Sequence, residues 1–244
     1  MKTIIKKAAR ALGFQISRYP PAPGSTDLYP LWCSQLRTGG SPGIIFDVGA
    51  NRGSTAVRLR SEFPESTVYA FELGPSAFAE LKAGTSKDPM IKSFQLALGE
   101  RDGTSTLNEN AFDLTNSLLP NSSQTSQFSP AGACVSTGAS PVPIIRLDSF
   151  CAKEGIKRID VLKIDTQGYE KQVLTGAGDL LTPASVRCLF LEVLFVNLYK
   201  GQTWCGEVME LLRSRGYRFF GFTGVVFDQV NGWKWADAMF IGDK

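Results

Sequence analysis

The stretch that decides the fold is Ile44-Ile45-Phe46-Asp47-Val48-Gly49-Ala50-Asn51-Arg52-Gly53. Its first half is apolar, its second half is rich in small residues, and residues 54–60 then mix apolar with charged side chains. An apolar run, a tight turn and a mixed segment in this order predict a buried parallel strand that leads into a helix. Gly49 and Gly53 let the turn bend sharply and let a ligand lie against the main chain. The stretch therefore has the layout of the ligand-binding loop in a doubly wound α/β fold.

The acids near this loop indicate which kind of ligand it binds. A dinucleotide loop has the pattern G-x-G-x-x-G, whereas this chain has Gly49-x-Asn51-x-Gly53 and a carboxylate, Asp47, just before it. An anion there would repel a pyrophosphate but attract the ammonium and sulfonium groups of S-adenosylmethionine. Glu72 ends the next apolar run and is placed to bind ribose hydroxyls, which both cofactor types carry. The pair favours S-adenosylmethionine; a structural turn capped by Asp47 is the alternative.

Composition narrows the class of protein. The 244 residues fit one large α/β domain, and a net charge of +3 is too small to indicate nucleic-acid binding. The five cysteines are scattered without a C-x-x-C pair, which is typical of reduced thiols in a cytoplasmic protein. The sequence has no histidine, so histidine bases and histidine metal sites are excluded. Acid–base chemistry must come from other side chains.

The chain divides into an N-terminal region, 1–43, and an α/β domain, 44–244. Residues 2–14 place apolar side chains on one helical face and basic ones on others, and a proline-rich linker follows at 20–24. Such a basic amphipathic helix predicts peripheral contact of residues 1–18 with the inner face of a membrane. A helix packed on the domain is the alternative. No apolar run is long enough to span a bilayer. The pattern of cysteines leads us to expect a cytoplasmic protein.

Strand and helix patterns alternate from residue 44 onward. Together they predict a Rossmann-like, seven-stranded and mostly parallel sheet with helices on both faces and an antiparallel last hairpin. The expected strands lie at 44–48, 67–72, 91–96, 160–165, 186–193, 217–221 and 236–241. Residues 108–143 are rich in Ser, Asn, Thr, Gly and Pro. We interpret them as a flexible insertion that faces the substrate, with a short strand near 116–119; a merely mobile surface loop is the alternative.

Several motifs then resemble one family in order and spacing, the FkbM-type methyltransferases of the class I S-adenosylmethionine-dependent fold. They are Asp47-Val48-Gly49-Ala50-Asn51-Arg52-Gly53, Ala97-Leu98-Gly99-Glu100, Asn116-Ser117-Leu118, Arg146-Leu147-Asp148-Ser149-Phe150, Asp160 to Glu170, Glu192-Val193 and Tyr199-Lys200-Gly201-Gln202. The resemblance covers roughly residues 44 to 241. Two departures stand out: many members have Val-Glu at Thr166-Gln167, and Lys200 stands where an acid is expected.

Strand ends of an open parallel sheet converge on one cleft, so the candidate site residues follow from the expected strands. We predict that the cofactor is held by Asp47, Gly49, Asn51, Gly53, Glu72, Ala97 and Leu98, with Asp47 supporting either the ammonium or the loop. A hydroxyl acceptor must lose a proton, and we predict Asp165 as its base and Glu192 as the second candidate. The alternative for Asp165 is cofactor contact alone. We predict no metal, with Mg²⁺ on Asp165 and Glu192 as the alternative.

Taken together, the sequence predicts an S-adenosylmethionine-dependent O-methyltransferase. The resemblance and the basic N-terminal helix point to a hydroxyl on a saccharide or another small natural product, and nucleic acid is not expected as a partner. Four aromatic residues could border a sugar, although such residues more often form core: Tyr199, Trp204, Phe219 and Phe220. The rival functions are an NAD-dependent oxidoreductase and a non-catalytic cofactor-binding or scaffold protein.

Overall fold

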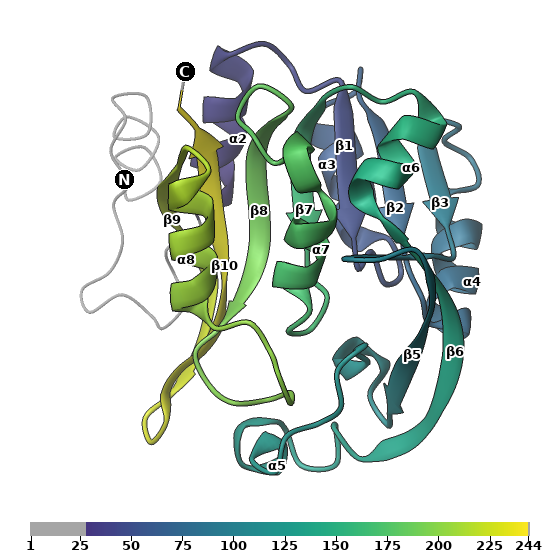
Figure 1. Ribbon diagram of the computed structural model, residues 1–244, viewed down its shortest axis with the longest axis vertical. Coiled ribbons are helices and arrows are strands. Elements are labelled where there is room, and N and C mark those ends of the chain that lie inside the picture. Colours follow the sequence, from purple (N-terminus) through teal and green to yellow (C-terminus); the bar gives the residue numbers. More distant parts are fainter. Residues whose placement is uncertain (1–27, 244) are drawn as a thin grey trace, which may run out of the picture.

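A computed structural model describes residues 28–243 of the chain. The basic helix predicted at 2–14 and the linker at 20–24 therefore lie outside the described residues. The described part is a three-layer α/β structure, with a central sheet between two layers of helices (Figure 1).

The central sheet has seven strands, as predicted. Five of them are parallel, and β10 runs antiparallel to both of its neighbours, β8 and β9. In spatial order the strands are β3 (Ile91–Phe94), β2 (Thr67–Phe71), β1 (Ile44–Val48), β7 (Ile159–Ile164), β8 (Val186–Leu194), β10 (Gly232–Gly242) and β9 (Tyr217–Asp228). The chain order reverses direction between β1 and β7, and ligands of open α/β sheets bind at such a switch point.

Helices cover both faces of this sheet, which confirms the predicted layering. One face carries α2 (Tyr29–Thr38), α3 (Ser54–Glu62) and α4 (Pro75–Thr85). The other carries α6 (Leu147–Glu154), α7 (Glu170–Gly176) and α8 (Cys205–Ser214). Figure 1 shows these last three in front of the sheet.

The side-chain alternation of the strands divides the core into two parts. Phe46 and Val48 of β1 pack with Phe150 of α6 on one face, whereas Ile45 packs with Trp32 of α2 on the other. Because successive residues of a strand point to opposite faces, Asp47 faces the α2 side. This placement decides what Asp47 can contact.

A second sheet has three strands, β4 (Ala97–Gly99), β6 (Ser136–Arg146) and β5 (Gly103–Asn110). We call residues 103–146 the arm; it contains β5 and β6, with η1 (Asp113–Thr115) and α5 (Thr125–Phe128) between them. Figure 1 shows the β5–β6 hairpin extending past the strand ends of the central sheet. The predicted insertion at 108–143 is thus partly regular strand. The strand expected near 116–119 is reduced to one bridge, between Asn108 and Ser117.

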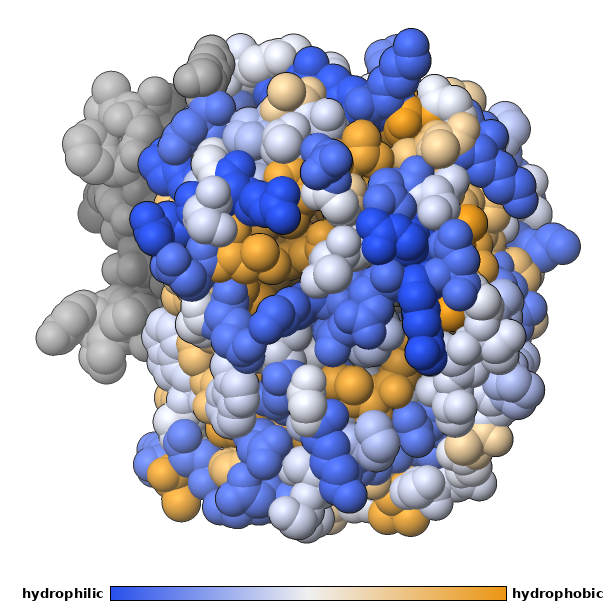
Figure 2. All heavy atoms as spheres, viewed as in Figure 1, coloured by the Kyte–Doolittle hydropathy of each residue, from blue (hydrophilic) through white to orange (hydrophobic). Residues whose placement is uncertain are grey.

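The surface carries separate apolar patches among polar side chains on the face that Figure 2 shows. Among residues 28–243, no helix is both long and apolar enough to cross a membrane.

Candidate functional site

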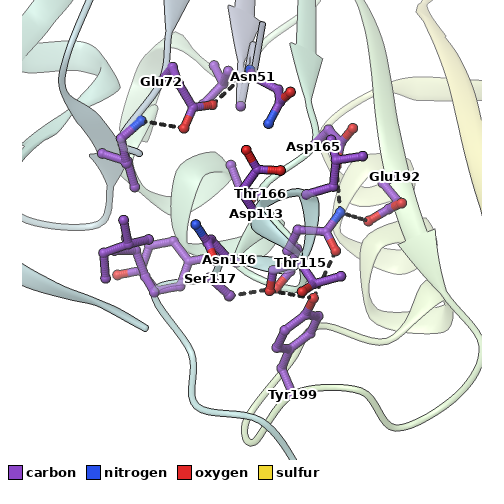
Figure 3. A pocket seen from close by; sticks show the side chains of 18 of the residues that line it. Asn51, Glu72, Asp113, Thr115, Asn116, Ser117, Asp165, Thr166, Glu192 and Tyr199 are labelled. Carbon is purple, nitrogen blue, oxygen red and sulfur yellow. Dashed lines mark hydrogen bonds between the residues drawn. The ribbon is translucent and has the colours of Figure 1, made fainter. Parts of the chain in front are cut away.

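A cavity of about 340 Å³ lies at the carboxyl ends of β1, β2, β7 and β8. This volume is in the range of small-molecule sites. Figure 3 shows Asn51 and Glu72 on one side of it, Asp165 and Glu192 on another, and Asn116 and Ser117 of the arm below. The cavity therefore joins the two groups of acids that the strand ends predicted.

The loop after β1 forms one wall, and its shape depends on Gly49. Gly49 has φ +77°, and a Cβ atom there would lie 1.8 Å from the main-chain oxygen of Asp165. Asn51 is also left-handed, with φ 46°, which is uncommon for a residue other than glycine. The N–H groups of Gly49 and Ala50 both donate to the carbonyl of Phe71, at 3.0 and 2.8 Å. The loop is thereby held against the end of β2.

Glu72 organises the same wall from the next strand end. Its Oε2 accepts the N–H of Asn51 at 2.8 Å, and its Oε1 accepts the N–H groups of Leu73 and Gly74 at 2.9 and 2.7 Å. Burial raises the pKa of Glu72 above its ordinary value, although these three donors act in the opposite direction. A carboxylate has about four lone-pair positions, so Glu72 keeps capacity for a ligand hydroxyl.

Asp47 does not line the cavity. Its side chain is fully buried on the α2 side, where it forms an ion pair with Lys163 at 3.0 Å. Lys163 Nζ also donates to the carbonyl of Gly49 at 2.9 Å. Burial alone would lower the pKa of Lys163, but the carboxylates of Asp47 and Asp165 outweigh it and the pKa is raised. Of the two roles predicted for Asp47, this geometry favours support of the loop.

An apolar part of the cavity lies beside Glu72. Phe71, Leu96, Ala97 and Leu98 line it, and Ala97 and Leu98 are almost fully buried in β4. A flat aromatic base fits such a wall, since its faces need no hydrogen-bond partners.

The opposite end of the cavity holds two carboxylates joined by one amide. Gln167 Nε2 donates to Asp165 Oδ1 at 2.9 Å and to Glu192 Oε2 at 2.8 Å. Asp165 Oδ2 lies 3.6 Å from Lys163 Nζ, as expected for two residues on the same side of a strand end. Tyr199 donates its hydroxyl to Gln167 Oε1 at 2.8 Å.

Glu192 is the more shielded of the two carboxylates. Burial raises its pKa well above the ordinary value, and the nearby charges of Asp165, Glu170 and Asp237 raise it further. Burial likewise raises the pKa of Glu170 and of Asp237 to about 7. This end of the cavity is therefore acidic, with Lys163 as the cation among these groups.

The arm closes the cavity through contacts with three different loops. Arg52 of the β1 loop pairs with Asp113 of η1 at 2.7 Å. Ser117 Oγ donates to the carbonyl of Gln167 at 2.7 Å, and the Tyr199 hydroxyl lies 3.1 Å from the carbonyl of Thr115. The arm is thus part of the site rather than a detached surface loop.

Seven of the nine predicted site residues line the cavity. They are Gly49, Asn51, Glu72, Ala97, Leu98, Asp165 and Glu192, whereas Asp47 and Gly53 do not. Gly53 instead ends the turn as the residue before α3, with φ +84°. Of the four aromatic candidates only Tyr199 lines the cavity, and Trp235 of β10 joins it.

Among the other residues that line the cavity, Gln167, Asn116 and Trp235 had no predicted role. Gln167 and Asn116 both lie inside motifs that carry the family resemblance, so that signal was present in the sequence. Trp235 lies in the β9–β10 hairpin, where nothing in the local pattern marks it.

Comparison with known proteins identifies the family. The model of the methyltransferase FkbM domain matches residues 47–219, which is most of the chain. The chain is a member of the FkbM methyltransferase family. It is therefore a methyltransferase that depends on S-adenosylmethionine, and this result sets aside the oxidoreductase alternative.

Named relatives agree with this assignment. The chain is 27% identical over 178 residues to the 2-O-methyltransferase NoeI of Sinorhizobium fredii, covering 70% of this chain and 71% of that protein. It is 28% identical over 202 residues to the 31-O-demethyl-FK506 methyltransferase FkbM of Streptomyces tacrolimicus, covering 71% and 72%. A solved FkbM methyltransferase from Methylobacillus flagellatus has the same fold, with a TM-score of 0.51 at 13% identity over 82% of this chain and 43% of that one.

The residues present fit this cofactor. The cavity offers a carboxylate for ribose hydroxyls at Glu72, a bare main chain at Gly49 and an apolar wall at Leu98. Within residues 28–243 no group of three or more His, Cys, Asp or Glu side chains is arranged to hold a metal ion.

Proposed function

We propose that this methyltransferase transfers the methyl group to a hydroxyl of a saccharide or another small natural product. The observation that carries the proposal is the pair of carboxylates, Asp165 and Glu192, at the end of the cavity away from Glu72. Two relatives, a 2-O- and a 31-O-methyltransferase, are named for methylation of oxygen, which supports the same chemistry here.

The residues near β1 and β2 would hold the cofactor. Glu72 would accept the ribose hydroxyls, the main chain at Gly49 and Asn51 would border the methionine part, and Ala97 with Leu98 would border the base. S-adenosylmethionine, when bound, supplies a methyl group on a positively charged sulfur, so no further activation of that carbon is needed. The protein's main task is then to position the acceptor.

The two carboxylates have different environments, which suggests different roles. Asp165 has 36% of its side chain exposed, so its Oδ2 can accept the proton of an acceptor hydroxyl. Glu192 is shielded and its pKa is raised, so it keeps a proton to a higher pH than an ordinary carboxyl group does. We assign Asp165 as the general base and Glu192 as the group that binds the acceptor.

The charge of this end limits the acceptor. Asp165, Glu192 and the nearby Asp237 would repel a phosphate or a uronic acid. A neutral polyhydroxyl compound instead brings hydroxyl donors that carboxylates accept, and Trp235 and Tyr199 offer apolar surface for a ring.

Methyl incorporation tests the proposal. Purified protein would be incubated with S-adenosylmethionine labelled in its methyl group and a panel of neutral p-nitrophenyl glycosides, matching uronides and polyhydroxylated natural products. The proposal expects label on a hydroxyl oxygen of a neutral acceptor, located by NMR of the product, and none on the uronides. Label on nitrogen or carbon, or uronides as the better acceptors, would overturn it.

A further inference from the structure

Gln167 is a residue of the site that contacts both carboxylates. One hydrogen of its side-chain amide points to Asp165 and the other to Glu192, at 2.9 and 2.8 Å between heavy atoms. Two carboxylates on one donor group lie close together, and their negative charges repel. The amide therefore separates the charges and also fixes the two side chains relative to each other.

The backbone of Gln167 is held in place from several directions. Its φ is 56°, in the left-handed region, and Gly168 follows at φ 93°. Glu170 Oε1 accepts the N–H groups of Thr166 and Gly168, at 3.0 and 3.1 Å, on either side of Gln167. Ser117 of the arm donates to its carbonyl at 2.7 Å. A left-handed residue other than glycine costs energy and persists only where its surroundings enforce it, as these contacts do.

The orientation of the amide is fixed as well. A glutamine side chain has one end that donates and one end that accepts. The two carboxylates accept hydrogen bonds, so Nε2 faces them, and the Tyr199 hydroxyl donates to Oε1 at 2.8 Å on the other side of the amide. Tyr199 itself is 1% exposed, which holds its hydroxyl in place.

We propose that Gln167 is a positioning residue, oriented by Tyr199, that holds Asp165 and Glu192 in the arrangement in which they receive the acceptor. This inference rests on the proposed function for its effect on turnover. Its effect on the two carboxylates does not depend on any acceptor, so each can be tested separately.

Three variants separate the positioning role from packing. Gln167→Met keeps the length of the side chain without its donors, Gln167→Glu replaces the donor by a third negative charge, and Tyr199→Phe removes the hydroxyl that orients the amide. Gln127→Met serves as the matched control, because Gln127 is an exposed residue of α5.

In the turnover assay we expect a selective loss. Hydrogen bonds to charged groups are worth enough for Gln167→Met to lower kcat/KM for the acceptor at least about tenfold. The decrease in kcat/KM should be larger for Gln167→Glu and smaller for Tyr199→Phe. In all three variants the Kd for S-adenosylhomocysteine should stay within about twofold of the wild-type value. Full turnover in Gln167→Met, or an equal loss of cofactor affinity, would overturn the proposal.

If no tested compound is methylated, thermal unfolding without an acceptor still tests whether Gln167 positions the two carboxylates. The charged or titratable groups that face Glu192 are Asp165 and Lys163 of the β7 strand and its end, Glu170 of α7, Asp237 of β10 and Tyr199 of the loop after β8. Without the amide, ionised carboxylates repel more strongly than protonated ones. The drop in Tm on Gln167→Met should therefore be about 4 °C or more larger at pH 8.5 than at pH 5.5.

Gln127→Met should change Tm by the same small amount at both pH values. A drop in Tm for Gln167→Met that is equal at pH 5.5 and pH 8.5 would show that Gln167 only packs, whatever the acceptor is. Failure of every acceptor together with a pH-dependent drop would overturn the proposed function and leave the role of Gln167 intact.

Discussion

Asp165 and Glu192 come from adjacent strands and differ mainly in what surrounds them. Asp165 faces the cavity and Lys163, whereas burial and three neighbouring acids raise the pKa of Glu192. Under the proposed function, the same functional group has two tasks, proton removal at Asp165 and acceptor binding at Glu192. The proposed difference in role depends on how far each carboxylate is shielded from solvent, not on the type of residue.

Replacing the proposed base tests this division at one residue. Asp165→Asn keeps the shape but cannot accept a proton, so we expect turnover to fall about 10²- to 10⁴-fold. Calorimetric titration with S-adenosylhomocysteine should give a Kd within about twofold of the wild type. Asp179→Asn, at an exposed aspartate of η2 (Gly178–Leu180), is the matched control. Unchanged turnover in Asp165→Asn would remove Asp165 as the base.

The sequence predicts well which residues line the cavity where a strand end places them. Glu72, Asp165 and Glu192 follow from the rule that parallel strands end at one edge. Asp47 is one residue from the end of β1 and so points to the other face, which its position in the motif alone does not reveal. Trp235 reaches the cavity through the β9–β10 hairpin, and no short-range pattern encodes that contact.

Among the elements, the loop after β1 is under the tightest steric constraint. A Cβ at position 49 would lie 1.8 Å from the main-chain oxygen of Asp165, and φ there is +77°. The close approach brings the β1 loop and the β7 loop together, and both of them line the cavity. The proposed cofactor site and the position of the proposed base, Asp165, therefore depend on the same contact.

Gly49→Ala should destabilise the protein by more than about 3 kcal/mol, because a main-chain clash cannot be relieved by a rotamer change. Gly84→Ala is the matched control: position 84 lies in α4, has open space around it, and should gain about 0.5–1 kcal/mol from helix propensity. Urea unfolding of both variants measures the difference. Equal free energies of unfolding for Gly49→Ala and Gly84→Ala would contradict the close approach of position 49 to the main chain of Asp165.

The arm shows where element prediction fails. The polar, proline-containing sequence of residues 108–143 predicts a loop, yet β5 (Gly103–Asn110) and β6 (Ser136–Arg146) extend into it and pair as antiparallel strands. A two-stranded ribbon beyond the main sheet needs no continuous apolar face, so its strands lack the alternation that marks a half-buried strand. Whether the segment between them is mobile stays a prediction.

For the whole molecule, the sequence predicts the seven-stranded sheet because β1, β2, β7 and β8 are apolar runs buried on both faces. The antiparallel position of β10 follows from the hairpin. The sequence could not predict that the partly buried Asp237 lies beside Glu192, because this contact arises from the register that pairs β10 with β8.

These acids give the whole molecule a pH-dependent stability. The folded-state pKa of Asp237 and of Glu170 is raised to about 7, so the folded protein binds more protons than the unfolded chain between their ordinary values and pH 7. The free energy of unfolding should therefore fall as pH rises through this window, by up to about 1.4 kcal/mol per pH unit for each group.

Thermal unfolding at several pH values tests this expectation. The Tm of the wild type should fall between pH 5 and pH 8. The Tm of Asp237→Asn should fall less over the same range, because the substitution removes one titrating group. Glu154 is an exposed residue of α6, so Glu154→Gln should keep the wild-type change of Tm with pH. A Tm that rises over this range, or an unchanged slope in Asp237→Asn, would contradict the assignment of buried acids.

The most direct test of the account is a crystal structure of the protein with S-adenosylhomocysteine. We predict that the ribose lies against Glu72, the base against Ala97 and Leu98, and the sulfur toward Asp165 and Glu192, with the arm closed over the ligand. A ligand bound elsewhere, or one whose sulfur faces away from both carboxylates, would contradict the assignment of the two ends of the cavity.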